Sequence, residues 1–266
     1  MLIIGSLFVF IALAFVIAYL VQRRKYGTIR ATPTFSVEQL QALSDDLARR
    51  GEGGSLRFIT EVKGRVGCEN PLIAELTETE CVYYRMKVEW EYEEIFYEED
   101  GDERREHKRE EEEVLAENKE TAPFWIEDDT DRIAIDPEGA ELIAKQTLSR
   151  VDDDEGFPDE VIRLGRFAME APWKTCDEER RPKEYRFEEE AIPLGHEVYV
   201  LGEAVDSNGV LRLQKPARGK FIISTRREES LLREGRLTMI GFVLGTIVFG
   251  LVGLAMVVMA LSATAP

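Results

Sequence analysis

The sequence is poor in the residues that bind metals and form disulfides, with 3 cysteines and 2 histidines among 266 residues. Cys68, Cys81 and Cys176 are widely spaced and include no C-x-x-C pair, which excludes a zinc ribbon and gives no disulfide framework. Tetrahedral zinc needs four ligands that converge on one point, and with His107 and His196 the chain has only five Cys and His residues in all. We therefore expect no metal and no cofactor, and we interpret the cysteines as buried or incidental thiols.

The sequence also lacks the short motifs of common enzymes. It has no G-x-S-x-G elbow, no G-x-x-x-x-G-K-[ST] phosphate loop, no G-x-G-x-x-G dinucleotide turn and no H-E-x-x-H. Neighbouring carboxylates mean little for acid–base catalysis in a chain with 52 acidic residues. No residue is assigned a catalytic role.

Positive charge is scarce, and the formal net charge is -18. A protein that holds phosphates along a nucleic acid needs a cationic face, so this balance argues against nucleic-acid binding. Two interpretations of the acidic excess stay open. One is ordinary solubility, and the other is adaptation to high salt, which the excess of Arg over Lys also suggests.

Two long apolar runs stand at the ends of the chain. Residues 2–21 and 237–261 carry no charge, and each run is long enough to cross a hydrocarbon core as a helix. The first lacks the cationic start and cleavage site of a signal peptide, so we interpret it as a retained anchor. The basic residues on the inner flanks of the two runs are Arg23, Arg24, Lys25, Arg226, Arg227, Arg233 and Arg236.

These flanks predict how the chain sits in a bilayer. The positive-inside rule places the central domain in the cytoplasm with both termini outside. The second run contains Gly241 and Gly245 at G-x-x-x-G spacing, which could let two copies pair through this span; the alternative is plain tolerance of small residues in membrane helices.

A short helix is predicted after the first span. Ser36 and Gln39 form a capping-box pattern, and apolar residues follow at helical spacing until Gly51. We expect the apolar stripe to pack on the following domain, although such a stripe can also lie on a lipid surface.

From residue 56 the pattern changes to period two. In residues 83–96, aromatic and aliphatic side chains alternate with charged ones, which predicts a strand with one buried and one charged face. Asp206 to Gly209 predict a hairpin turn between two later strands. The predicted fold is α+β and β-rich, a membrane-anchored antiparallel sheet or barrel-like domain between two transmembrane helices. We divide the chain into the first transmembrane helix with its basic flank (1–25), the juxtamembrane helix (26–55), the β-rich domain (56–225) and the helix that enters the second span (226–266).

Residues 98–113 are almost purely charged. An acidic loop that binds a cation or a partner is one interpretation. Arg and Lys are interleaved, however, and no EF-hand ligand order is present. We therefore favour a solvated charged segment, which is either a protruding hairpin or a mobile loop. His107 lies within it, with no Ser or Cys nearby to activate.

The order of these elements resembles the GIDE family, also called the BAM or beside-a-membrane domain. The residues that carry the resemblance are Gly64 and Val66 in KGRV, Pro123 and Phe124 in APFWIEDD, Gly202 in LGE, and Ser224, Leu231 and Leu232 in the stretch entering the second span. The family's eukaryotic members are mulan-type E3 ubiquitin ligases of mitochondrial and chloroplast outer membranes, whose domain between the spans faces the intermembrane space in mitochondria.

The resemblance implies an E3-related domain, with one departure. The ligases carry a RING with two zinc ions after the second span, and this sequence offers too few Cys and His residues for it, so a RING-less, prokaryote-like form without autonomous ubiquitin transfer is expected. The leading hypothesis is a non-catalytic interaction or scaffold module in envelope organisation or stress response, with an unknown membrane or cytoplasmic protein partner. The alternatives are an E3-ligase-like enzyme component whose RING or other catalytic part comes from another chain, and a lipid or small-ligand binder.

Overall fold

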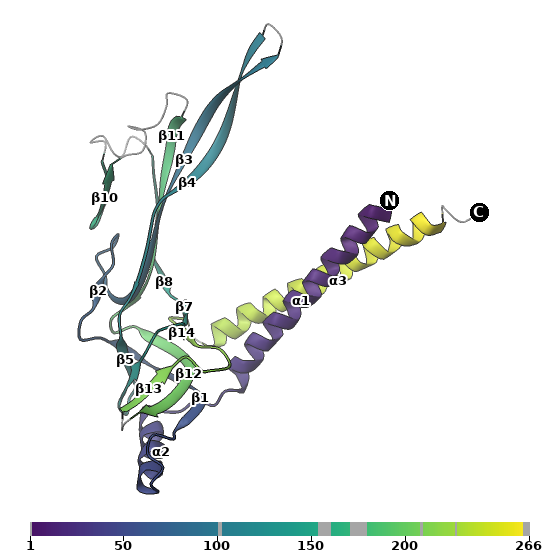
Figure 1. Cartoon of the computed structure of the whole chain (residues 1–266). Helices are drawn as coiled ribbons and strands as arrows, with labels where there is room; N and C mark the ends of the chain where they lie inside the picture. Colours follow the sequence, from purple (N-terminus) through teal and green to yellow (C-terminus); the bar gives the residue numbers. More distant parts are fainter. Residues whose placement is uncertain are drawn as a thin grey trace.

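The computed structural model describes residues 2–100, 103–153, 161–170, 180–207, 210–226 and 228–262. They form three parts: a pair of long helices, a small barrel, and a long sheet that projects from the barrel (Figure 1). Both long helices extend from the barrel, and their far ends, which carry the two chain termini, lie together (Figure 1).

The two long helices are apolar and pack against each other. They are α1 (Leu2–Ala31) and α3 (Glu228–Ser262), and the segments 3–23 and 235–260 are long and apolar enough to cross a membrane. The helices run antiparallel, because Gly5 of α1 lies beside Val257 of α3, whereas Phe15, later in α1, lies beside Gly245, earlier in α3. Phe8 and Phe15 both stack on Phe249, with ring centroids 5.7 and 5.6 Å from the Phe249 ring.

Glycines let these two helices approach closely within the chain, while pairing of two copies through the G-x-x-x-G spacing stays a prediction. A Cβ at Gly245 would lie 3.3 Å from the ring of Phe15, and one at Gly253 would lie 3.0 Å from the carbonyl oxygen of Gly5. Gly241 has no such neighbour within 4 Å. Gly245 is therefore used within the chain, which leaves Gly241 alone on the outer surface for any contact between copies.

The predicted juxtamembrane helix is α2 (Val37–Arg49), and its capping box is present. The Ser36 hydroxyl accepts the Gln39 N–H at 3.2 Å, and the Gln39 side chain accepts the Ser36 N–H at 2.9 Å. Val37 and Leu40 are fully buried in the barrel core, so the apolar stripe packs on the domain as expected.

Five of the described strands form a closed ring. In order around the ring they are β1 (Arg57–Gly67), β5 (Phe124–Glu127), β6 (Arg132–Ile135), β13 (Val210–Gln214) and β12 (Glu197–Ser207), which pairs back with β1. Numbered along the chain, the ring order is 1-2-3-5-4, with the third and fifth strands parallel. This is the strand order of the OB-fold, a five-stranded Greek-key barrel.

The barrel core is aliphatic and is filled by alternate residues of every ring strand, as the period-two pattern requires. Its buried residues include Val62, Val66, Phe124, Ile126, Ile133, Ile135, Val198, Val200 and Leu213. Two short strands extend the sheet beyond β12: β14 (Ile222–Ser224) pairs with β12, and β7 (Glu141–Ile143) pairs with β14. The predicted β-rich, barrel-like fold between two apolar helices is confirmed; the correction is that β6–β13 and β7–β14 are parallel pairs.

The projecting sheet, which we call the blade, is inserted into the barrel's connections. It consists of β2 (Leu72–Ile73), β3 (Glu80–Asp100), β4 (Glu103–Thr121), β8 (Lys145–Asp153) and β11 (Arg180–Pro193). Strand β3 pairs with β2 and β4 along one edge and with β11 along the other, and β11 pairs in turn with β8. The hairpin of β9 (Val161–Leu164) and β10 (Phe167–Glu170) contributes Ile162 and Phe167 to the blade's apolar cluster.

The two faces of β3 are those predicted from its alternation. Tyr84, Met86, Val88, Trp90 and Tyr92 are buried together in one cluster. On β11, Tyr185 and Phe187 join the same cluster, while the intervening β3 residues form the charged face. The blade therefore has an aromatic interior and one face covered with charge.

Residues 98–113 are strand wherever the structure describes them, which agrees with the protruding-hairpin alternative and not with the mobile loop. They form the end of β3 and the start of β4, and the two strands pair from Tyr83 with Thr121 to Asp100 with Glu103. Opposite charges meet across the pair: Lys108 lies 3.0 Å from Glu93, and Arg109 lies 3.1 Å from Glu94. Such pairs between facing strands favour the hairpin.

The hairpin predicted around residues 206–209 is present as β12 and β13. Several predicted features lie outside the described residues: Asn208 and Gly209 of its turn, Cys176, Arg227, and residues 154–160 of the expected connection.

Candidate functional site

The residues that carried the family resemblance lie mainly in the framework of the barrel. Val66 and Phe124 are in its core. Gly64 lies where β1 and β5 cross so closely that a Cβ would sit 2.6 Å from the carbonyl oxygen of Glu127. At Gly202 a Cβ would sit 2.9 Å from the ring of Phe221. These residues therefore close the barrel.

The remaining pattern residues mark the connection to α3. Ser224 is buried, and its hydroxyl accepts the Arg226 N–H at 3.0 Å. Thr225 donates its N–H to the carbonyl of Ile143 at 2.9 Å, which ties the connection to β7. Leu231 and Leu232 lie in α3, and their side chains are outside the described part. Pro123 is exposed, and its carbonyl accepts the Cys68 thiol at 3.3 Å.

The connection from α1 is fixed by a buried carboxylate that sequence reasoning missed. Glu61 on β1 is 2 % exposed; it accepts hydrogen bonds from the hydroxyls of Thr34 and, at 3.0 Å, of Tyr199. The Phe35 N–H also donates to the Glu61 carbonyl at 3.1 Å. Glu61 alternates along its strand like any solvent-facing residue, so no local signal identifies it. Both apolar helices are thus joined to the barrel through hydrogen-bonded connections.

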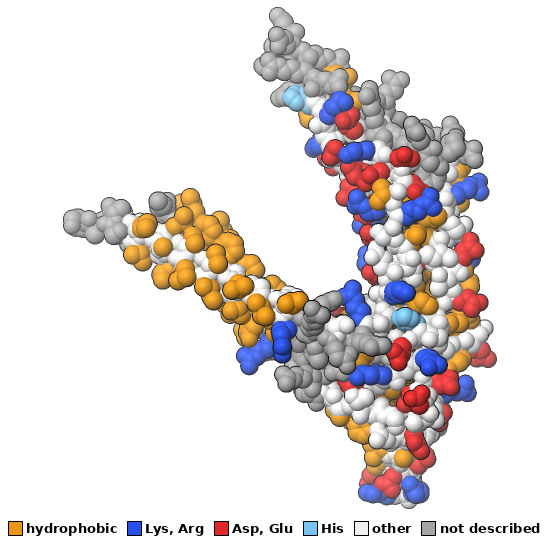
Figure 2. Space-filling view, turned by 180° about the vertical axis from the view of Figure 1, so that it is seen from behind, with side chains coloured by type: hydrophobic (Ala, Val, Ile, Leu, Met, Phe, Trp, Pro, Cys, Tyr) orange, Lys and Arg blue, Asp and Glu red, His pale blue; other side chains and the backbone are white. Residues whose placement is uncertain are grey.

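The structure brings the two basic flanks together. Because α1 and α3 are antiparallel, the inner ends of both apolar segments meet at the barrel, where Lys and Arg side chains gather at the base of the apolar helices (Figure 2). Arg23, Arg226 and Arg236 are exposed there. The side chains of Arg24, Lys25 and Arg233 lie outside the described part, as does Arg227.

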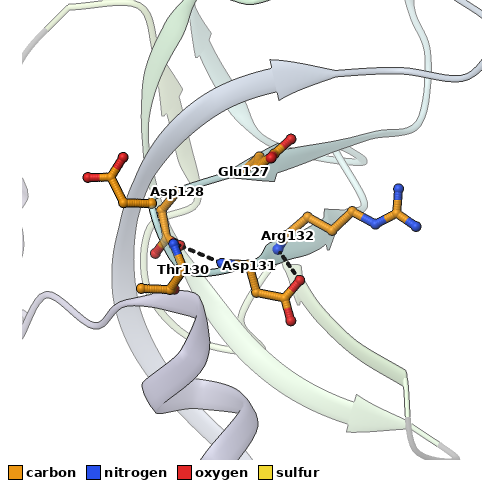
Figure 3. A pocket seen from close by; sticks show the side chains of 6 residues that line it. Glu127, Asp128, Thr130, Asp131 and Arg132 are labelled. Atoms are coloured by element: carbon orange, nitrogen blue, oxygen red, sulfur yellow. Dashed lines mark hydrogen bonds between the residues drawn. The ribbon is translucent and has the colours of Figure 1, made fainter.

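An acidic turn between β5 and β6 lines an open pocket of about 300 Å³ (Figure 3). Its side chains are those of residues 127–132. Asp128 accepts the N–H groups of Thr130 and Asp131 with one carboxylate oxygen, at 2.8 and 3.0 Å, and the N–H of Val37 with the other, at 2.8 Å. The Asp128 carboxylate therefore closes its own turn and caps α2, an Asx-turn with a structural role.

These contacts alter the titration of Asp128. Burial raises its pKa, but hydrogen bonds from the Thr130 hydroxyl and from the backbone N–H groups outweigh burial and lower the pKa below its ordinary 3.8. A carboxyl with a depressed pKa stabilises the fold fully above 3.8, and this contribution is lost as the pH falls through the lower folded value.

We expect Asp128→Asn to lower the free energy of unfolding at pH 7 by about 1 kcal/mol, since the charge-assisted hydrogen bonds to the turn and to α2 are weakened. The difference in the free energy of unfolding between wild type and Asp128→Asn should disappear as the pH falls below 3.8. Urea unfolding at pH 7 and pH 3 measures it, with the exposed neighbour variant Asp129→Asn as control. A gap that persists at pH 3, or an equal loss in the control, would contradict this role.

The charged face of the blade is a lattice of ion pairs between three strands. Lys183 on β11 bridges Glu91 on β3 and Glu110 on β4, at 2.9 and 2.8 Å. The hydrogen bond from Lys183 lowers the pKa of Glu91. Arg186 lies 3.4 Å from Glu112. The face is therefore acidic overall, with its cations engaged in pairs between strands.

The blade ends in a two-stranded tip. Strand β11 last pairs with β3 at Arg180 and Glu94, and beyond this point β3 pairs with β4 alone among the described strands. Phe96 and Tyr97 are 43 % and 45 % exposed there, and Phe96 stacks on His107 with ring centroids 5.4 Å apart. We call residues 95–97 and 107–108 the tip. Sequence reasoning missed it because the alternation of residues 83–96 predicted burial for the whole aromatic face of the strand, Phe96 included.

A comparison with protein families identifies the domain. The family model GIDE, described as E3 ubiquitin ligase, matches residues 93–259, more than half of the chain. The chain belongs to the GIDE family. The match confirms the resemblance and runs from the distal blade through the barrel into the second apolar helix; Gly64 and Val66 lie before it. No curated protein and no solved structure matches the chain.

The GIDE family is described as ligase-related, but the described residues of this chain show no metal centre. Among them, no group of three or more Cys, His, Asp or Glu side chains is arranged to hold an ion. Cys81 is fully buried, and burial raises the pKa of its thiol to about 11, which keeps it protonated. The surfaces that remain for function are the tip, the charged face and the basic flanks.

Proposed function

We propose that this GIDE-family chain is a membrane-anchored interaction module that presents the tip of its blade to a protein partner. The observation that carries the proposal is the exposed aromatic pair Phe96 and Tyr97 at the end of the hairpin. Aromatic side chains are enriched where proteins bind one another, because they bury a large area at little entropic cost.

The shape of the hairpin supports this function. At about 3.3 Å per residue, the 21 residues of β3 span roughly 70 Å, far more than a barrel strand needs. A two-stranded ribbon is marginally stable in water, and no third described strand pairs with the tip, so the tip adds little to the stability of the described fold. Reach toward a partner is a use that accounts for both its length and its exposed aromatics.

The proposal includes a location. The two apolar helices anchor the domain in a bilayer, and the basic flanks favour a cytoplasmic domain with both termini outside. The partner is then a membrane or cytoplasmic protein, and the module serves envelope organisation or a stress response as a scaffold.

A variant with one exposed cysteine tests the tip and the orientation together. In a chain with Cys68 and Cys176 replaced by serine and the buried Cys81 retained, Phe96→Cys is expected to react with a membrane-impermeant maleimide in inverted vesicles but not in intact cells. With a cleavable thiol-reactive cross-linker it should capture one discrete protein band in native membranes. Val114→Cys is the matched control, because Val114 is 48 % exposed on the same hairpin but away from the tip.

The labelling and cross-linking results test the orientation of the domain and the role of the tip separately. Labelling of both variants in intact cells would overturn the cytoplasmic orientation. Equal capture by Phe96→Cys and Val114→Cys, or capture by neither, would overturn the role of the tip.

A second function is favoured by the family description. The GIDE model is described as an E3 ubiquitin ligase, and the described residues provide no zinc ligand set, so a catalytic RING or other active part would come from another chain. The captured band decides between the two functions. A protein with its own active site, reproducibly bound at the tip, supports an enzyme component, whereas a structural membrane protein supports the scaffold.

A further inference from the structure

We propose that strand β8 of the blade pairs edge to edge with β8 of a second copy of this chain. The inference goes beyond the proposed function, because it assigns a second interaction surface, with a different partner from the one at the tip. It rests on the strand order of the blade, in which β4 and β8 are the outer strands. Among the described strands, β4 pairs only with β3, and β8 pairs only with β11.

The β4 edge is protected by charge against pairing with its own copy. Four consecutive glutamates, residues 110–113, lie in the middle of this strand. Two copies paired antiparallel across this segment would set glutamate opposite glutamate, and like charges that face each other across a strand pair are destabilising. Charge on an edge strand is a common means by which proteins prevent such pairing.

The β8 edge lacks this protection. Its sequence, KQTLSRVDD, contains both signs of charge and no glutamate, and the Val151 side chain is 51 % exposed. The register shift between β8 and β11 lies between residues 146 and 148, so residues 149–153 form regular strand. A regular edge presents a row of backbone N–H and C=O groups to which another strand can bind.

These five residues are complementary to themselves when two copies pair antiparallel about Val151. Val151 then faces Val151 of the second copy, and Arg150 faces Asp152 of the second copy on both sides of this centre. Arg150 already binds Asp152 of its own strand, with Nε and Oδ1 2.6 Å apart, so the four charges would alternate in sign within one cluster. An apolar centre with opposite charges at both flanks favours a second copy as the occupant of this edge.

The position of the membrane helices is compatible with such a pair. Figure 1 shows the helix pair on one side of the blade and β10 on the other. A two-fold axis through Val151, perpendicular to the sheet, superposes one blade on the other without exchanging the two faces. The helices of both copies therefore leave the joined sheet on the same side, as two copies anchored in one bilayer require.

A symmetric disulfide tests the pairing. In a full chain with Cys68 and Cys176 replaced by serine and the buried Cys81 retained, Val151→Cys is oxidised with copper phenanthroline in native membranes. Paired residues have Cα atoms about 4.5 to 5.5 Å apart, which a disulfide spans, so we expect a covalent product of twice the chain mass. Val114→Cys is the matched control, because Val114 is 48 % exposed on the β4 edge, and it should stay monomeric.

Two further sets of variants test the register and the charges. Ser149→Cys and Asp153→Cys should cross-link with each other in mixed membranes more than either does with itself. In detergent, Arg150→Glu should raise the dissociation constant of the dimer about tenfold, measured by sedimentation equilibrium, because two opposite-charge pairs become like-charge pairs. Exchange of the two residues, Arg150→Asp with Asp152→Arg, should restore it. Arg163→Glu makes the same change of charge at an exposed residue of β9 and should have no effect.

Several results would overturn the proposal. They are equal cross-linking of Val151→Cys and Val114→Cys, no cross-linking of Val151→Cys, and a product whose mass shows a different protein bound at residue 151. An equal weakening by Arg163→Glu would show that general repulsion rather than the β8 register controls association. None of these readouts involves Phe96 or Tyr97, so failure here leaves the proposed role of the tip standing.

Discussion

Replacement of Trp90 by alanine is expected to lower the free energy of unfolding of the blade by about 4 kcal/mol. The Trp90 side chain is fully buried at the middle of β3 and stacks on Tyr92 with ring centroids 4.3 Å apart. Across the sheet it is registered with Tyr185 on β11, which is equally buried. The substitution leaves a cavity lined by aromatic rings that a β-sheet cannot collapse to fill, because its strands are held at fixed spacing.

Urea unfolding in detergent, followed by circular dichroism of the strands, measures this loss. Phe96→Ala is the matched control on the same strand: the ring is 43 % exposed at the tip, so its removal should change stability by less than about 0.5 kcal/mol. The pair also separates the buried aromatic face from the exposed tip, since Phe96→Ala should leave the blade folded. A stable Trp90→Ala protein would mean that the aromatic face is not the interior of the sheet.

The second large effect is expected at Gly64, where alanine should cost about 3 kcal/mol. A Cβ at this position would lie 2.6 Å from the Glu127 carbonyl oxygen and 2.9 Å from the carbonyl carbon. The obstacle is backbone rather than a flexible side chain, so β1 and β5 must separate. That movement strains the ring at the pairing of Arg65 with Glu127.

Gly53→Ala is the control for this prediction, because its nearest neighbour would be an ordinary contact at 3.6 Å from the Cα of Ala48. It should be neutral or slightly stabilising, since alanine reduces the entropy of the unfolded chain. Hydrogen exchange of the β1 and β5 amides in both variants reports on the ring directly. Native-like protection of these amides in Gly64→Ala would show that the barrel tolerates the added Cβ.

Much of the fold follows from local patterns. The alternation along β3, the capping box of Ser36 and Gln39, and the two apolar runs each involve residues a few positions apart, where the periods of strand and helix act directly. The charged stretch shows the limit of such reasoning. For residues 98–113 local pattern left a protruding hairpin and a mobile loop as alternatives, and the pairing of β3 with β4 over the described residues decides for the hairpin.

The candidate sites depended on distant residues and could not be predicted in the same way. The ring closes through β1 and β12, which are separated by the whole blade, and the buried role of Glu61 exists only because Thr34 and Tyr199 meet it there. The tip became visible from the exposure of Phe96 and Tyr97 on paired strands.

The amino-acid sequence by itself determined that this protein has two apolar helices, a capped juxtamembrane helix and a β-rich domain between them. These features are written in the spacing of apolar side chains, which need burial whatever the topology. Tertiary structure alone decided that the strands close into an OB-type barrel and that the β3–β4 hairpin extends beyond the other described strands. Those arrangements arise from contacts between residues far apart in the chain, which no local period encodes.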